Sequence, residues 1–161
     1  MRKHIRTLVA ADMQPATSVF VGGGTPTMLP AEELLSVLAE IPLASRAEVT
    51  VECNPDDITL EMMQRYLRGG VNRVSIGVQS TVDHVLQSLG RTHNPENVQR
   101  AVAHVKQAGF LTFNLDIMYG AAGESLADWQ QTVADIVALE PPHVSAYGLT
   151  IEANTPLASQ P

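Results

Sequence analysis

Polar or glycine-rich residues stand at the end of each of five strand-like runs in this chain. The first run ends in three glycines at residues 22 to 24, among them Gly23 and Gly24, and Thr25 and Pro26 follow. The other four runs deliver, in chain order, Glu52, Gln79, Asp116 and Thr150. Bare backbone N–H groups can hold an anionic or zwitterionic ligand, and the residues together suit a small molecule with polar and charged parts. Because α/β barrels and open parallel sheets bind ligands at the carboxyl ends of their strands, we expect one small-molecule site here.

Each of these candidates also has a plain structural interpretation. The three glycines could simply form a tight turn without binding anything. Glu52 could be a solvated charge, and Gln79 could be a core amide whose hydrogen bonds are satisfied. Asp116 favours a ligand role more strongly, since a carboxylate in an apolar strand is costly unless it is paired or faces a wet pocket. We interpret Cys53 as a buried small hydrophobe and His93 as a helix neighbour without chemistry.

The elements that position these residues alternate along the chain. Strands are predicted at residues 18–21, 48–53, 73–79, 111–119 and 143–150. Helices are predicted at 30–40, 59–68, 81–89, 95–108 and 125–140, and residues 2–12 have the pattern of the end of a helix. Strands that alternate with helices at a spacing of about 30 residues indicate βα units and a parallel sheet. The predicted fold class is therefore α/β, as a partial parallel (β/α) barrel.

Side chains alternate between the two faces of a strand, which separates polar from apolar positions in the middle three strands. One face carries the small or polar residues Thr50, Glu52, Asn54, Ser75, Gly77, Gln79, Asn114, Asp116 and Met118. The opposite face is apolar and suited to packing on helices. The phase of the fifth strand is ambiguous. A barrel interior with a polar mouth would produce this pattern.

Composition limits the functions that fit. With 161 residues, 45% of them hydrophobic, the chain can build one domain over residues 1–161. Ten basic against 17 acidic residues give a net charge of -7, so a nucleic-acid or membrane-surface role has no electrostatic support. No run reaches the roughly 18 apolar residues of a membrane span, and we expect a cytoplasmic protein. The single cysteine cannot alone hold zinc or an iron-sulfur cluster.

Six short motifs in order carry a resemblance to a known family. They are Gly-Gly-Gly-Thr-Pro at 22–26, Glu-Cys-Asn-Pro at 52–55, Ser-Ile-Gly-Val-Gln-Ser at 75–80, Leu-Gly-Arg-Thr-His at 89–93, Asn-Leu-Asp-Ile-Met-Tyr-Gly at 114–120 and Ser-Ala-Tyr-Gly-Leu-Thr at 145–150. Together they resemble the radical S-adenosylmethionine core of the oxygen-independent coproporphyrinogen III oxidase family. The segment at 89–93 is closer to the HemW-type heme chaperone branch than to the oxidase proper.

The resemblance implies a cofactor site and a role. In that family, the backbone matching Gly23, Gly24 and Thr25 holds the methionyl end of S-adenosylmethionine. The residues matching Glu52, Gln79, Arg91 and Asp116 complete the polar contacts, and Thr150 lies where the last strand lines the same pocket. Heme or porphyrin is the implied partner, in heme delivery or in porphyrin biosynthesis.

The chain also departs from the family pattern. The family carries Cys-x3-Cys-x2-Cys, which holds a 4Fe-4S cluster, and this sequence contains no such motif. We therefore expect a core fragment without the family's first strand and carboxyl-terminal region. Such a fragment would be inactive in radical chemistry by itself and would have an exposed barrel edge that favours self-association. The open alternatives are the oxidase proper, a non-catalytic binding remnant, and an unrelated barrel enzyme that binds phosphate at the glycines.

Overall fold

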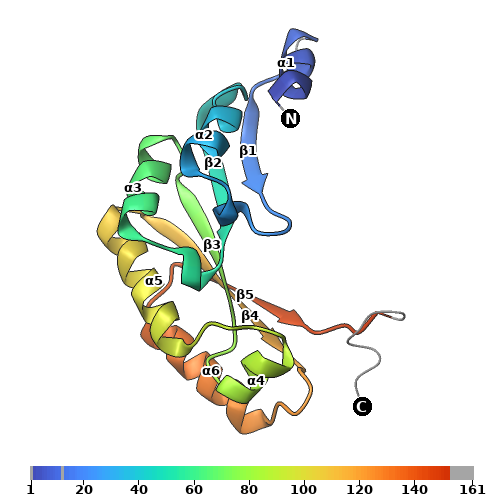
Figure 1. Cartoon of the computed structure of the whole chain (residues 1–161), viewed down its shortest axis with the longest axis vertical. Helices are drawn as coiled ribbons and strands as arrows, with labels where there is room; N and C mark the ends of the chain where they lie inside the picture. The colour runs from blue at the N-terminus through green and yellow to red at the C-terminus, as the bar shows by residue number, and fades with distance from the viewer. Residues whose placement is uncertain (1, 12, 153–161) are drawn as a thin grey trace.

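The computed structural model describes residues 2–11 and 13–152, and within them five parallel strands form one curled sheet (Figure 1). Neighbouring strands pair in chain order, β1-β2-β3-β4-β5, and each pair is parallel. Helices fill the connections, and α2, α3 and α5 lie along one side of the sheet in Figure 1. This arrangement is a half-barrel of βα units, so the predicted α/β partial barrel is confirmed.

The elements match most of the expected boundaries. The strands are β1 (Ala16–Val21), β2 (Leu43–Cys53), β3 (Arg73–Gln79), β4 (Thr112–Tyr119) and β5 (His143–Gly148). The α-helices are α1 (Arg2–Ala10), α2 (Ala31–Leu38), α3 (Leu60–Arg68), α4 (Asp83–Ser88), α5 (Pro95–Ala108) and α6 (Leu126–Ala138). Two short 3-10 helices, η1 (Pro26–Met28) and η2 (Pro55–Asp57), follow β1 and β2.

The predicted helix caps are present. The Thr59 hydroxyl accepts the Met62 N–H at 3.2 Å, and Asn94 caps α5 in the same way at 2.9 Å. Ser125 and Asp128 form a reciprocal capping box at the start of α6. Each cap satisfies N–H groups that the first helical turn leaves without a partner. Local sequence therefore decides where these three helices begin.

Several predicted boundaries differ by two residues or more, and three of these differences have a tertiary cause. β2 starts five residues early, because Leu43 pairs with Ala16 of β1. α4 begins only at Asp83, since the residues before it turn sharply and bond to α6. β5 ends at Gly148, where its pairing with Tyr119 ends, so Thr150 lies beyond the strand.

The two faces of the sheet differ as the alternation indicated. The face toward the helices is the core, and its strand residues are Val49, Val51, Cys53, Val74, Ile76, Val78, Phe113, Leu115 and Ile117. They pack with helix residues such as Met63, Tyr66, Val102 and Ile136. The burial of these apolar side chains is the main stabilising contribution to the fold. The concave face carries mostly small and polar side chains, together with Phe20, Met118 and Tyr147.

No helix in the described part of the chain has the length and apolar character to cross a membrane. The longest of the described helices, α5, has 14 residues. About 20 predominantly apolar residues are needed for a span.

Candidate functional site

A pocket of about 510 Å³ occupies the concave face and is lined by residues of all five strands. The strand residues include Phe20, Glu52, Ser75, Gly77, Gln79, Asn114, Asp116, Ser145 and Tyr147. Gly24, Thr25 and Arg91 reach the same pocket from loops. Ser145 and Tyr147 on this face resolve the phase of the fifth strand, which the sequence left ambiguous. The lining includes Glu52, Gln79 and Asp116 toward the carboxyl ends of their strands, where the chemistry-bearing residues were expected, and it extends back to Arg73 at the start of β3.

The glycine loop is built around Glu52. The Gly23 N–H donates to Glu52 Oε2 at 3.0 Å, so the loop amide holds a carboxylate of the next strand. A Cβ on Gly22 would lie 2.8 Å from that same oxygen, which excludes any larger residue without displacing Glu52. Gly23 and Gly24 have φ values of 85° and 62°, a region that residues with a Cβ rarely adopt. The three glycines are therefore required by the backbone path and by the carboxylate.

Thr25 and Pro26 continue the glycine loop into η1, and this helix is fastened to the turn after β2. The Thr27 hydroxyl, which is buried, donates to Asp57 Oδ2 of η2 at 2.5 Å. Because η1 and η2 follow adjacent strands, this contact fixes the two loops that form one side of the pocket mouth.

Asp116 is paired inside the protein and also faces the pocket. Its Oδ2 accepts the Ser75 hydroxyl at 2.6 Å, and its Oδ1 accepts the Asn114 amide N–H at 2.7 Å. The same Asn114 amide donates to Ser75 Oγ at 2.8 Å. Neutral donors hold the carboxylate without cancelling its charge, so it remains an acceptor for a hydroxyl or a cation.

Asn114 is 2% exposed and connects Asp116 to the fifth strand. Its Oδ1 accepts His143 Nδ1 at 2.5 Å and the Ser145 hydroxyl at 3.1 Å. The carboxylate of Asp116 can only accept, which fixes the orientation of the amide and places the proton of His143 on Nδ1. These supporting residues were not among the predicted site residues. Their signal was the strand alternation, which had placed Ser75 and Asn114 on the polar face.

Gln79 ends β3 with its backbone turned out of the strand. Its φ is 65°, and the Ser80 N–H bonds to the Val78 carbonyl across it at 2.8 Å. The pairing with β4 is shifted between Gly77 and Gln79, which is a β-bulge. A bulge redirects a side chain at a strand end, and here Gln79 lines the pocket.

Arg91 reaches the pocket from the loop after α4. Its Nη1 lies 3.5 Å from Asn54 Oδ1, close to the end of β2. The loop is held by His93, whose Nε2 bonds to the Val78 carbonyl at 2.8 Å. Burial lowers the pKa of His93, which favours a neutral ring that donates from Nε2. His93 is thus a structural contact between the Arg91 loop and β3.

Thr150 is the one predicted site residue that the structure keeps apart from the others. It is exposed, follows the end of β5 and does not line the pocket. Gly23 adjoins the pocket through its bond to Glu52. The remaining predicted residues, Gly24, Thr25, Glu52, Gln79, Arg91 and Asp116, all line one pocket.

Cys53 is a core residue, as its place on the apolar face indicated. Its side chain is 4% exposed and belongs to the core cluster behind the sheet. Burial raises the pKa of the thiol to about 12, and the carboxylates of Asp57 and Glu52 add to this. Within the described residues no three His, Cys, Asp or Glu side chains could together hold a metal ion.

Comparison with known families matched one model. The model described as the radical SAM superfamily, where SAM stands for S-adenosylmethionine, matches residues 1–136.

Curated relatives share a name. The protein named heme chaperone HemW of Escherichia coli is 43% identical over 148 residues, which cover 89% of this chain and 39% of that protein. Those of Mycobacterium tuberculosis H37Rv and Bacillus subtilis are 39% and 33% identical, covering 94% and 96% of this chain and 40% and 42% of theirs. This chain therefore spans less than half the length of these relatives.

Solved structures share the fold. Coproporphyrinogen III oxidase (HemN) from Escherichia coli, described as a radical SAM enzyme, superposes with a TM-score of 0.79 at 23% identity. That match covers 92% of this chain and 37% of the oxidase. Methylornithine synthase (PylB) gives 0.76 at 14% identity, over 99% of this chain and 47% of the synthase. At such identities the likeness establishes the half-barrel alone.

Proposed function

The chain belongs to the radical SAM superfamily, and we propose that its concave pocket binds S-adenosylmethionine. This ligand carries an ammonium group, a carboxylate, a sulfonium and ribose hydroxyls. The observation that carries the proposal is that carboxylates and guanidinium groups line one pocket. Glu52, Asp116 and Arg73 lie on strands, and Arg91 lies on a loop. A ligand with both charges and hydroxyls matches these groups.

The contacts follow from the position of each group. Glu52 and the glycine loop suit the ammonium end, because Glu52 is an acceptor already fixed by the Gly23 N–H. Arg91 suits the carboxylate, and Asp116 suits the ribose hydroxyls. Gln79 can both donate and accept beside them. For Thr150 the structure offers no contact with this ligand.

The phosphate alternative is less well supported by the same geometry. A phosphate at a glycine loop needs free N–H groups, whereas the Gly23 N–H is bonded to a carboxylate. A phosphate there would face the negative charge of Glu52 at short range.

The 4Fe-4S cluster that the family implies does not fit the residues present. Such clusters are held by several cysteine thiolates. The sequence has one cysteine, and its thiol is buried in the core with a pKa of about 12. The proposal is therefore limited to cofactor binding by this chain, and no radical step is assigned to it.

Calorimetric titration of the protein with S-adenosylmethionine tests the proposal. We expect saturable binding by the unmutated protein. The affinity should fall at least about tenfold in Asp116→Asn and in Glu52→Gln, since each variant loses a charged hydrogen-bond acceptor worth about 1.5–3 kcal/mol. Glu33→Gln on the exposed face of α2 is the matched control and should bind normally. Equal affinity in all four proteins, or displacement by a sugar phosphate, would contradict the proposal.

We propose a wider role in heme or porphyrin delivery, in the cytoplasm, on the basis of the relatives named heme chaperones. The protein should then bind hemin saturably and pass it to an apo-protein acceptor, which the absorbance of the bound heme would report. Turnover of S-adenosylmethionine to methionine and 5'-deoxyadenosine would instead favour the oxidase alternative. Binding of S-adenosylmethionine with neither heme transfer nor turnover would favour a non-catalytic protein.

We also propose that the protein associates with itself through β1. This strand lies at one edge of the described sheet and pairs only with β2 among the described strands. An unpaired edge offers N–H and C=O groups to another strand. Sedimentation velocity should show a dimer whose fraction falls in Ser18→Lys, a charge on an exposed edge residue. An unmutated protein that sediments as a monomer at all concentrations would contradict this.

A further inference from the structure

The backbone at Gln79 forms a three-residue turn that is unusual for a residue with a Cβ. Its φ of 65° and the bond from the Ser80 N–H to the Val78 carbonyl, at 2.8 Å, define this turn. A turn of this kind is strained and persists only when neighbouring contacts hold it. The contacts that hold it therefore decide where the Gln79 side chain points.

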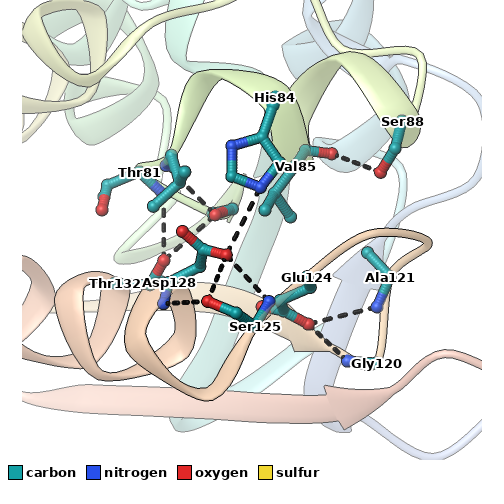
Figure 2. A network of polar contacts seen from close by, with 12 residues as sticks. Thr81, His84, Val85, Ser88, Gly120, Ala121, Glu124, Ser125, Asp128 and Thr132 are labelled. Atoms are coloured by element: carbon teal, nitrogen blue, oxygen red, sulfur yellow. Dashed lines mark hydrogen bonds and ion pairs between the residues drawn. The ribbon is translucent and has the colours of Figure 1, made fainter.

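Thr132 of α6 makes the central contacts on the side away from the pocket. Its Oγ1 lies 3.0 Å from Ser80 Oγ and accepts the Thr81 N–H at 3.3 Å. The adjacent Asp135 accepts the Thr81 hydroxyl at 2.6 Å. Figure 2 shows Thr132 facing Thr81 across the gap between α6 and α4. Thr132 and Ser80 are both fully buried, so water cannot replace these bonds.

The same two helices are joined a turn further along. His84 of α4 lies 3.3 Å from Asp128 of α6, and Asp128 is bonded to the Ser125 cap (Figure 2). His84 is more than half exposed, so this second contact contributes less. Thr132 and Asp135 both link α6 to the residues that follow Gln79, and of the two only Thr132 is fully buried.

We propose that Thr132 is a positioning residue for the pocket. It does not line the pocket, and it acts by holding the turn at residues 80–81 so that Gln79 points at the ligand. This inference rests on the proposed binding of S-adenosylmethionine. It adds that α6, behind the sheet, controls the affinity through one hydroxyl.

A double-mutant cycle on S-adenosylmethionine binding tests the proposal. Thr132→Val keeps the shape and removes the hydroxyl, whereas Thr132→Ser keeps the hydroxyl. We expect Thr132→Val to weaken binding about fivefold, the effect of one neutral hydrogen bond, and by less than about twofold in a Gln79→Ala background. Thr132→Ser should bind as the unmutated protein does. Thr59→Ala, which removes the distant α3 cap, should lower stability without changing affinity.

A merely structural role would give a different pattern. An equal loss in both backgrounds, or a loss of stability without a loss of affinity, would overturn the proposal. So would normal binding by Gln79→Ala, because the residue to be positioned would then be irrelevant.

Hydrogen exchange separates this proposal from the proposed function. In the ligand-free protein, Thr132→Val should accelerate exchange of the Thr81 amide by about tenfold relative to the unmutated protein. If the protein binds no S-adenosylmethionine, the proposed function fails. In that case the proposal that Thr132 orients Gln79 toward this ligand fails with it, and exchange at Thr81 reports only whether Thr132 holds the turn. If S-adenosylmethionine does bind, unchanged exchange at Thr81 would overturn the positioning role.

Discussion

Replacing Asn114 by Asp tests whether the Asn114 amide donates hydrogen bonds to Asp116 and Ser75 inside the half-barrel. The change is nearly isosteric, but it replaces the N–H donor that lies 2.7 Å from Asp116 Oδ1 with a carboxylate oxygen. The charge-assisted bond to Asp116 is worth about 1.5–3 kcal/mol, and the bond to Ser75 about 1 kcal/mol. Repulsion between the new, buried carboxylate and the partly buried one of Asp116 adds to this loss. We expect the free energy of unfolding to fall by about 3 kcal/mol or more at pH 7.5.

The dependence on pH identifies the cause. At pH 4.5 a proton shared by the two neighbouring carboxyl groups of the variant relieves the repulsion, so the deficit should shrink to about 1 kcal/mol. Asn114→Leu is the uncharged comparison and should show a deficit of similar size at both pH values. Asn94→Asp, at an exposed cap where either residue serves, should cost little.

Urea denaturation at the two pH values measures these differences. A deficit in Asn114→Asp that is the same at pH 4.5 and 7.5 would refute the reasoning, because it would mean that no carboxylate of Asp116 lies beside the new charge. A stable Asn114→Asp protein at pH 7.5 would refute it as well.

Three further predictions follow from single residues. Gly22→Ala must displace the Glu52 carboxylate, so it should weaken S-adenosylmethionine binding about tenfold in a titration, and normal binding would contradict the 2.8 Å approach. The pKa of the Cys53 thiol is raised from 9.0 to about 12, so the folded protein keeps this proton at pH values where the unfolded chain has lost it. The free energy of unfolding should therefore fall as pH rises above 9, by about 1.4 kcal/mol per pH unit. Urea denaturation between pH 8 and 10 should show this fall in the unmutated protein and a flatter profile in Cys53→Ala. Tyr66→Phe removes a buried hydroxyl that has no partner among the described residues, so its melting temperature should stay the same or rise, and a fall would reveal a partner.

Much of the fold could be predicted because its signals are local. Thr59, Asn94 and Ser125 mark helix starts by bonding to N–H groups three residues away, which any reader of the sequence can find. Alternation in three strands placed polar residues on one face, and the structure put them on the concave side. The boundaries that failed, at β2 and β5, depend on which residue of a distant strand lies opposite.

The order of elements and the polar face of the sheet could be predicted from the sequence, since periodicity and capping act over a few residues. Six of the pocket residues, Gly24, Thr25, Glu52, Gln79, Arg91 and Asp116, were also predicted, whereas others such as Ser75 and Asn114 were not. The contacts that hold those residues come from tertiary packing. Two of these contacts join segments that are far apart in the chain, namely the bond from Gly23 to Glu52 and the contact of Thr132 with Ser80. The second lies beside Gln79, whose backbone is left-handed. The strained turn at Gln79 is held by contacts with α6, about fifty residues further along the chain, and no local pattern encodes them.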